Sequence, residues 1–130
     1  AQEVAIGRRT DQYRHLIGQP LAGALGPRAV LVKGGHLAED TDGCLDLLYD
    51  GETAVELPGP RFDTGHTHGG GDSLAAAIAS GLARGMELEA AVRFGKRYIV
   101  EAVRHAYPLG AGHGPVSALW AGRPWWDERD

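Results

Sequence analysis

The sequence has 130 residues, of which 43% are hydrophobic and 23% are charged. This balance is ordinary for a globular domain and argues against a disordered chain, and the length predicts that residues 1–130 form a single domain or part of one. A net charge of −4, with no apolar run near the roughly 20 residues that span a bilayer, argues against nucleic-acid and membrane partners, which favour basic patches.

Cys44 is the sole cysteine in the sequence, so no internal disulfide can form. A reducing compartment suits such a protein. The first residues also lack the basic region and apolar run of a secretory leader. We therefore expect a cytoplasmic protein.

Two elements are expected in the first part of the chain. Thr10 can cap a short helix. The apolar face of this helix would consist of Tyr13, Leu16 and Ile17. The continuous apolar run at residues 29–32 then predicts a fully buried strand of the parallel kind, which ends at Lys33-Gly34-Gly35.

A hairpin is expected next. Residues 45–49 form a second apolar run, and residues 53–57 alternate between apolar and polar side chains. Asp50-Gly51 lies between them, and this dipeptide favours a tight turn between antiparallel strands.

Two helices follow a cluster of glycines. The first is expected over residues 74–84, with Gly85 just past its end, where glycine is the usual terminating residue. Its apolar face would consist of Leu74, Ala77, Ile78, Gly81 and Leu82. The second is expected over residues 87–106 and is stopped by Pro108. The glycine-rich tail, which carries three tryptophans at 120, 125 and 126, is expected to be irregular.

This order of elements predicts an α/β fold. The strands are few for a parallel sheet, since a typical sheet has about five or six. Either the chain dimerises, or it is the C-terminal part of a larger fold.

The sequence Gly69-Gly70-Gly71-Asp72 is the strongest candidate for chemistry. Consecutive glycines let a backbone approach a ligand closely and direct several N–H groups at one point. The helix that follows adds its positive N-terminal end, so the segment is suited to hold a phosphate or an oxyanion. Asp72 could then accept a proton from an attacking hydroxyl. The alternative is a flexible loop in which Asp72 only caps the helix.

Other polar residues are less specific. His66 and His68 have the His-x-His spacing of zinc ligands, but no third ligand lies at a convincing distance in the sequence, which favours hydrogen bonding beside the loop. Lys33 ends an apolar strand, where a phosphate is a plausible partner. A solvent-exposed strand end is the alternative for Lys33. We expect His36 to be structural, and the role of His113 stays open between a ligand contact and a loop cap.

Three segments, taken together, resemble one family. They read Val-Leu-Val-Lys-Gly-Gly-His-Leu at 30–37, Asp-Thr-Gly-His-Thr-His-Gly-Gly-Gly-Asp at 63–72 and Leu-Gly-Ala-Gly-His-Gly-Pro at 109–115. In this order they resemble the C-terminal half of hydroxymethylpyrimidine/phosphomethylpyrimidine kinase, an enzyme of thiamin biosynthesis. The hairpin and the two helices have the spacing of that family.

The resemblance implies a fold, a reaction and roles for residues. The fold would be the C-terminal part of a ribokinase-like three-layer α/β/α fold. The reaction would be the ATP- and Mg²⁺-dependent phosphorylation of a pyrimidine alcohol and then of its monophosphate, by an enzyme that we expect to be a homodimer. The implied site consists of Lys33 and Thr67 at the ATP phosphates, Gly69, Gly70 and Gly71 as the anion hole, and Asp72 as the base.

The sequence departs from the family pattern in two places. The family usually has Gly-Thr-Gly-Cys where this chain has Gly-Gly-Gly-Asp at 69–72. The aspartate resembles sugar and pyridoxal kinases of the superfamily, which leaves a pyridoxal-type substrate as an alternative. The sequence also lacks most of the family's N-terminal half. Glu3 could be the glutamate of an Asn-x-x-Glu motif that helps to place Mg²⁺, in which case the chain is a piece of a longer kinase. A short relative that keeps only the nucleotide half, or an inactive nucleotide-binding module, is the other interpretation.

Overall fold

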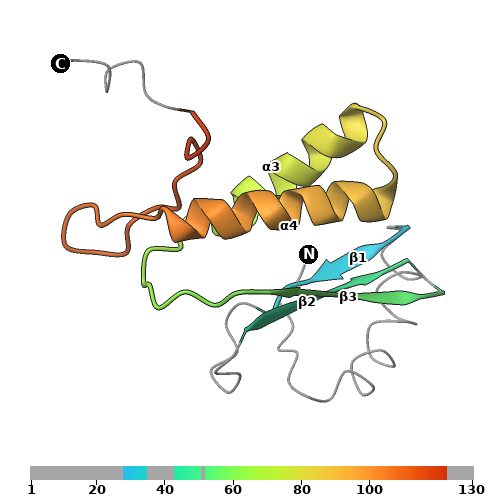
Figure 1. The fold of residues 1–130 in the computed structure, drawn as a ribbon, viewed down its shortest axis with the longest axis horizontal. Helices are drawn as coiled ribbons and strands as arrows, with labels where there is room; N and C mark the ends of the chain where they lie inside the picture. Colours follow the sequence, from blue (N-terminus) through green and yellow to red (C-terminus); the bar gives the residue numbers. More distant parts are fainter. Residues whose placement is uncertain (1–27, 35–42, 51, 123–130) are drawn as a thin grey trace. The chain divides into compact units, whose positions relative to one another are not determined.

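Three short strands form an antiparallel sheet in the first part of the chain. They are β1 (Val30–Val32), β2 (Cys44–Tyr49) and β3 (Ala54–Gly59), in the order β1-β2-β3 (Figure 1). The computed structural model describes residues 28–34, 43–50 and 52–122. The chain divides into two compact units, Ala1–Arg61 and Phe62–Asp130, which are described one at a time. The predicted helix after Thr10 lies outside the described residues, as do Glu3, His36 and the last two tryptophans.

The prediction of a parallel strand at residues 29–32 is wrong for the pairing that the structure describes. β1 runs antiparallel to β2, with Val30 opposite Tyr49 and Val32 opposite Leu47. A parallel pair needs a crossover connection of about a dozen residues or more, usually a helix, and only residues 33–43 separate the two strands. Val32 is fully buried, whereas Val30 and Leu31 are half-buried.

The predicted hairpin is confirmed. β2 and β3 pair antiparallel from Cys44 opposite Gly59 to Tyr49 opposite Ala54. The turn differs in detail, because the N–H of Asp50 donates to the carbonyl of Thr53 at 3.2 Å. Asp50 therefore begins the turn instead of lying at its centre. Its carboxylate accepts the N–H groups of Glu52 and Thr53 at 2.9 and 2.7 Å, and these bonds hold the pKa of Asp50 below its ordinary value.

A buried carboxylate on β2 fastens the end of β1. Asp46 is only 3% exposed, and its Oδ1 accepts the N–H of Gly34 at 2.9 Å and the thiol of Cys44 at 3.7 Å. A side chain at Gly34 would overlap the carbonyl of Leu45, so the backbone needs glycine to come this close. The prediction of an apolar run at residues 45–49 did not include this contact between Asp46 and Gly34.

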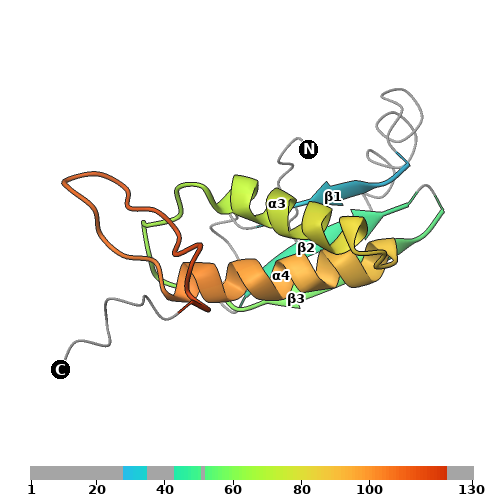
Figure 2. The ribbon, with the colours of Figure 1, turned by 90° about the horizontal axis from the view of Figure 1, so that it is seen from above.

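Two helices follow in the second unit. α3 (Gly70–Ala83) and α4 (Leu88–Arg104) pack against each other as an antiparallel pair (Figures 1 and 2). α3 begins four residues before the predicted start, because Gly70 and Gly71 adopt helical conformations despite their low propensity. Neither helix is long and apolar enough to cross a membrane, nor is any other helix among the described residues.

The predicted end of α3 is confirmed. Gly85 has a left-handed φ of 82°, and its N–H donates to the carbonyl of Leu82 at 3.0 Å. The N–H of Met86 donates to the carbonyl of Gly81 at 3.1 Å. These two bonds form the motif that most often terminates a helix on glycine.

The helix pair packs most closely at Gly95. A Cβ there would lie 2.6 Å from Cγ1 of Ile78 and 3.1 Å from Cδ1 of Leu74. The buried residues of the pair are Leu74, Ala77, Gly81, Ala91, Val92, Gly95, Lys96 and Ala102. Leu74, Ala77 and Gly81 of the predicted apolar face of α3 are buried. Leu82 of the same face is 44% exposed.

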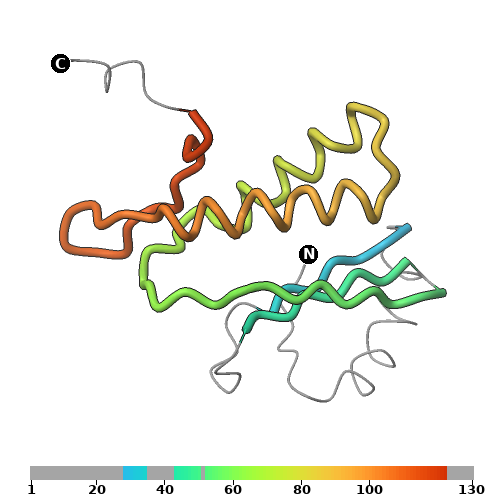
Figure 3. Tube along the Cα trace, viewed as in Figure 1, coloured from blue at the N-terminus to red at the C-terminus, as the bar shows by residue number. Residues whose placement is uncertain are grey.

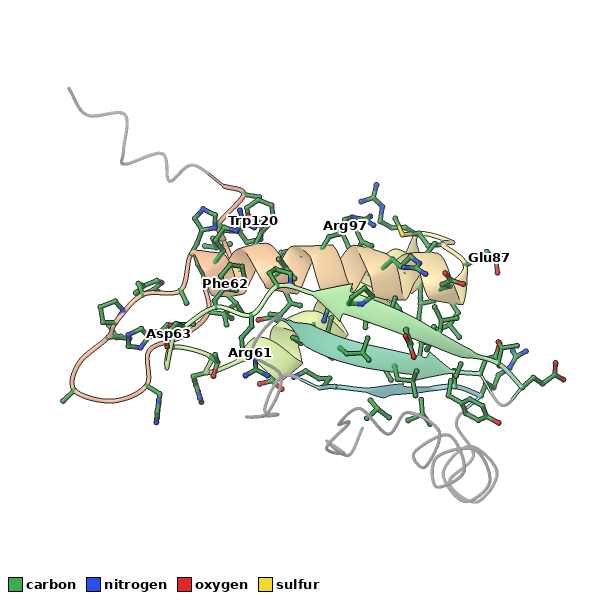
Figure 4. The ribbon with its side chains drawn as sticks, turned by 60° about the horizontal axis from the view of Figure 1, so that its bottom comes forward. Arg61, Phe62, Asp63, Glu87, Arg97 and Trp120 are labelled. Atoms are coloured by element: carbon green, nitrogen blue, oxygen red, sulfur yellow. The ribbon has the colours of Figure 1, made fainter. Side chains whose placement is uncertain are left out.

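The chain after α4 folds back along that helix. The Tyr98 hydroxyl donates to the carbonyl of Ala118. The ring of Trp120 stacks on His105, with centroids 6.1 Å apart and planes 13° apart. At the same end of α4, the Arg104 guanidinium lies 5.5 Å from the centre of the Phe62 ring. Figure 4 labels Trp120 and Phe62 beside this end of the helix.

We predict that Asp46→Ala destabilises the protein by about 1–3 kcal/mol, since it leaves the buried N–H of Gly34 without its acceptor. Asp46→Asn keeps an oxygen at the same place and should lose less. Urea unfolding measures both, with the exposed Glu56→Gln on β3 as the control. Equal losses for the alanine and asparagine variants would show that this hydrogen bond does not matter.

We also predict that Gly95→Ala lowers stability. Overpacking costs about 1–3 kcal/mol, and the better helix propensity of alanine offsets at most about 1 kcal/mol of it. The control is Gly112→Ala, because no atom lies within 4 Å of a Cβ at that loop position. Thermal unfolding should show a lower midpoint for Gly95→Ala alone; an unchanged midpoint would contradict the packing argument.

Candidate functional site

The glycine loop leads directly into α3. Gly69 is the residue before the helix and has a left-handed φ of 77°, which favours glycine. The N–H of Gly70 donates to the carbonyl of Thr67 at 3.1 Å, and the N–H of Ser73 donates to the carbonyl of Gly69 at 2.9 Å. These bonds close the first turn of the helix.

Two backbone N–H groups in the first turn of α3 have no hydrogen-bond acceptor among the described residues. The N–H groups of Gly71 and Asp72 donate to no described residue, as expected within the first turn of a helix. The positive end of the helix adds to their attraction for an anion. Gly70 was predicted as part of the same anion hole, but its N–H is already bonded to Thr67. The N–H of Gly69, another residue of the predicted anion hole, donates to no described residue.

Asp72 is the third residue of α3, and its side chain is exposed. No hydrogen bond or ion pair joins its carboxylate to another described residue. The residue that caps the helix is Gly69, which has no side chain to do so. The alternative that Asp72 serves as a helix cap is therefore not supported, and its carboxylate remains available beside the two N–H groups.

A second loop, residues 110–116, lies alongside the first, although no local pattern in the sequence pairs them. His68 and Pro115 form a parallel bridge. The N–H of His68 donates to the carbonyl of Gly114 at 3.3 Å, and the N–H of Val116 donates to the carbonyl of His68 at 3.0 Å. The tube in Figure 3 shows the chain after α4 turning back beside the segment that precedes α3.

Two histidines join the same loops through their side chains. The N–H of Gly114 donates to Nδ1 of His66 at 2.9 Å. Nδ1 of His113 lies 2.8 Å from the carbonyl oxygen of Gly65. His66 is half-buried, and the Oγ1 of Thr64 accepts its backbone N–H at 3.1 Å. The open question about His113 is thus answered in part, because its ring holds the glycine loop.

The predicted site residues fall into three groups. Thr67, Gly69–Gly71 and Asp72 come together at the start of α3. Lys33 follows β1 in the first unit, where the residue is half-buried and has an interaction partner. Glu3 lies outside the described residues. The roles assigned to all of these residues stay predictions.

The described residues contain no group of three histidine, cysteine, aspartate or glutamate side chains that could hold a metal ion. The ring of His66 is engaged with Gly114, and His68 is exposed.

The known proteins that are similar to this chain are kinases. The family model of phosphomethylpyrimidine kinase matches residues 7–117. Hydroxymethylpyrimidine/phosphomethylpyrimidine kinases of Mycobacterium bovis and Streptomyces coelicolor are 58% and 50% identical over 97 and 98 residues, which are 75% of this chain and 35% of each relative. The chain therefore spans about a third of the length of the curated relatives it matches.

Solved structures are similar as well. The pyridoxal kinase of Bacillus subtilis in an ADP complex has a TM-score of 0.78 and 31% identity, over 92% of this chain and 43% of that one. The pyridoxal kinase of Staphylococcus aureus with AMP-PCP and pyridoxal has a TM-score of 0.68 and 33% identity, over 74% and 36%. These similarities confirm the predicted ribokinase-like α/β fold, and the match to the family model over most of the sequence shows that the chain belongs to the phosphomethylpyrimidine kinase family.

Proposed function

We propose that this chain carries the phosphoryl-transfer site of an ATP-dependent kinase that phosphorylates 4-amino-5-hydroxymethyl-2-methylpyrimidine and then its monophosphate. One observation carries the proposal: two unpartnered N–H groups and an available carboxylate meet at the start of α3. Kinases of this family name are 58% identical over the matched region. Similar pyridoxal kinases have been solved with ADP and with AMP-PCP, which supports ATP as the donor.

The residues at the start of α3 have separate tasks in this proposal. The N–H groups of Gly71 and Asp72 bind the negative charge of the group being transferred, in fixed positions that need no rearrangement during the reaction. The Asp72 carboxylate accepts the proton of the substrate hydroxyl as its oxygen attacks phosphorus. ATP supplies the phosphoryl group. Lys33 and Thr67 contact the remaining phosphates.

Magnesium is proposed only as a requirement of the reaction. The described residues contain no three-ligand cluster, and Glu3, the residue proposed to help place Mg²⁺, is not among them. No step is therefore assigned to the ion. A homodimer is proposed from the small number of strands and from the resemblance, and a cytoplasmic location from the single cysteine.

A pyridoxal-type substrate is the second candidate. It is favoured by Asp72, which stands where the family usually has cysteine, and by the similarity to pyridoxal kinases at 31–33% identity. Higher identity to relatives named for the pyrimidine makes the pyrimidine the first choice. Turnover of the pyrimidine alcohol, its monophosphate and pyridoxal, measured side by side, separates the two. Binding of ATP without turnover of any of them would instead identify an inactive nucleotide-binding module.

We predict that Asp72→Asn lowers kcat by about 10²–10⁴-fold, the usual contribution of a general base. ATP affinity, measured by calorimetry, should change little, because the backbone donors remain. Glu89→Gln is a matched control, since Glu89 is the acidic residue in the first turn of α4 and pairs with Arg93 at 2.7 Å. Unchanged turnover in Asp72→Asn would remove the assigned role.

We further predict where ATP touches the backbone. In ¹H–¹⁵N spectra, addition of ATP should shift the amide resonances of Gly71 and Asp72 more than that of Gly70, whose N–H is already bonded to Thr67. The amide of Gly85, which is bonded within the turn after α3, serves as the unaffected reference. Shifts centred away from the start of α3 would contradict the proposed anion hole.

A further inference from the structure

The glycine loop has almost no side chains of its own with which to hold its shape. Gly65 and Gly69–Gly71 make up much of it, and Gly69 has open space around its Cα. Glycine loses more conformational freedom on folding than any other residue. A segment that must hold two N–H groups in fixed positions therefore needs support from outside itself.

The support comes from residues 110–116 and has a reciprocal form. His66 of the first loop accepts a hydrogen bond from the backbone of Gly114 in the second. His113 of the second loop reaches the carbonyl of Gly65 in the first. The bridge between His68 and Pro115 lies immediately beyond these contacts along both segments. Each loop thus provides one imidazole and one backbone group to the other.

The partners fix the chemical form of the two rings. A backbone N–H can only donate, so Nδ1 of His66 must carry a lone pair. A carbonyl oxygen can only accept, so Nδ1 of His113 must carry a hydrogen. Nδ1 therefore carries no hydrogen in His66 and carries one in His113.

No residue larger than glycine fits at position 114 of the second loop. A Cβ at Gly114 would overlap the carbonyl oxygen of Tyr107 and lie 3.0 Å from Nδ1 of His66. Gly114 is buried, and among the described residues its N–H finds its acceptor in the His66 ring. Loss of the His66 ring would leave a buried donor unsatisfied.

We infer that His66 and His113 are positioning residues that hold the glycine loop against residues 110–116, and so fix the N–H groups of Gly71 and Asp72 for the transferring phosphoryl group. This inference rests on the proposed function of the loop. The transferring charge must meet those donors in the transition state. His66 and His113 therefore affect the stability of the transition state more than the ground-state binding of either substrate.

Asparagine provides a sharp test, because its amide atoms lie as many bonds from Cα as the Nδ1 of histidine. Asn at 66 offers an oxygen to the N–H of Gly114, and Asn at 113 offers an N–H to the carbonyl of Gly65. His66→Ala and His113→Ala should lower kcat about 10–100-fold with a smaller change in KM, since a misplacement near 1 Å costs up to about 10²-fold. His66→Asn and His113→Asn should recover most of that loss.

The control is His105→Asn. His105 also has Nδ1 near a carbonyl oxygen, that of Glu101 at 2.9 Å, and its ring stacks on Trp120, so these contacts involve neither loop. It should keep the kcat of the parent protein. Circular dichroism and thermal unfolding of all five variants establish that each is folded before its rate is compared.

Two outcomes overturn the inference. One is equal activity of the alanine and asparagine variants in a parent protein that turns over. The other is a hydrogen on Nδ1 of His66, or none on Nδ1 of His113. Long-range ¹H–¹⁵N spectra of the unliganded protein would detect either one. A parent protein without kinase turnover would instead count against the proposed function, while the spectra would still decide whether the two histidines join the loops.

Discussion

The start of an α-helix always leaves backbone N–H groups without partners in the helix, and the proposed phosphoryl-transfer site uses two of them. Most helices place serine, threonine, aspartate or asparagine before the first turn, where the side chain occupies a free donor. Here Gly69 takes that position with no side chain, and the carboxylate of Asp72 bonds to no described residue. The donors of Gly71 and Asp72 therefore stay open to a ligand, beside the positive end of α3.

This arrangement has a conformational cost that the rest of the second unit offsets. Each glycine in the first turn weakens the helix by roughly 0.5–1 kcal/mol relative to alanine. α3 compensates by close packing on α4 around Gly95, and by a hydrogen-bonded end at Gly85. The rigid helix pair thus supports a first turn that would be unfavourable by itself, and a precisely held backbone at that turn is what charge stabilisation in phosphoryl transfer requires.

Local patterns in the sequence were sufficient for the hairpin and for the end of α3 at Gly85, because each depends on residues close together in the chain. They failed where a partner lies far away. The antiparallel pairing of β1 is decided by β2, and the buried Asp46 is explained only by Gly34. The contact between His66 and Gly114 joins residues 48 positions apart, and neither residue carries a local signal for it.

Gly114 shows why such distant contacts matter more than their number suggests. Its N–H donates to His66, its carbonyl accepts the N–H of His68, and the carbonyl of Tyr107 occupies the space where a side chain would begin. Three segments therefore meet at one residue that has no side chain. Any substitution of Gly114 would separate the two loops at their point of contact. The open N–H groups of Gly71 and Asp72, a few residues after His68, would then lose their fixed direction. The position of the proposed anion hole is thus determined as much by a glycine in the second loop as by the glycines of the first.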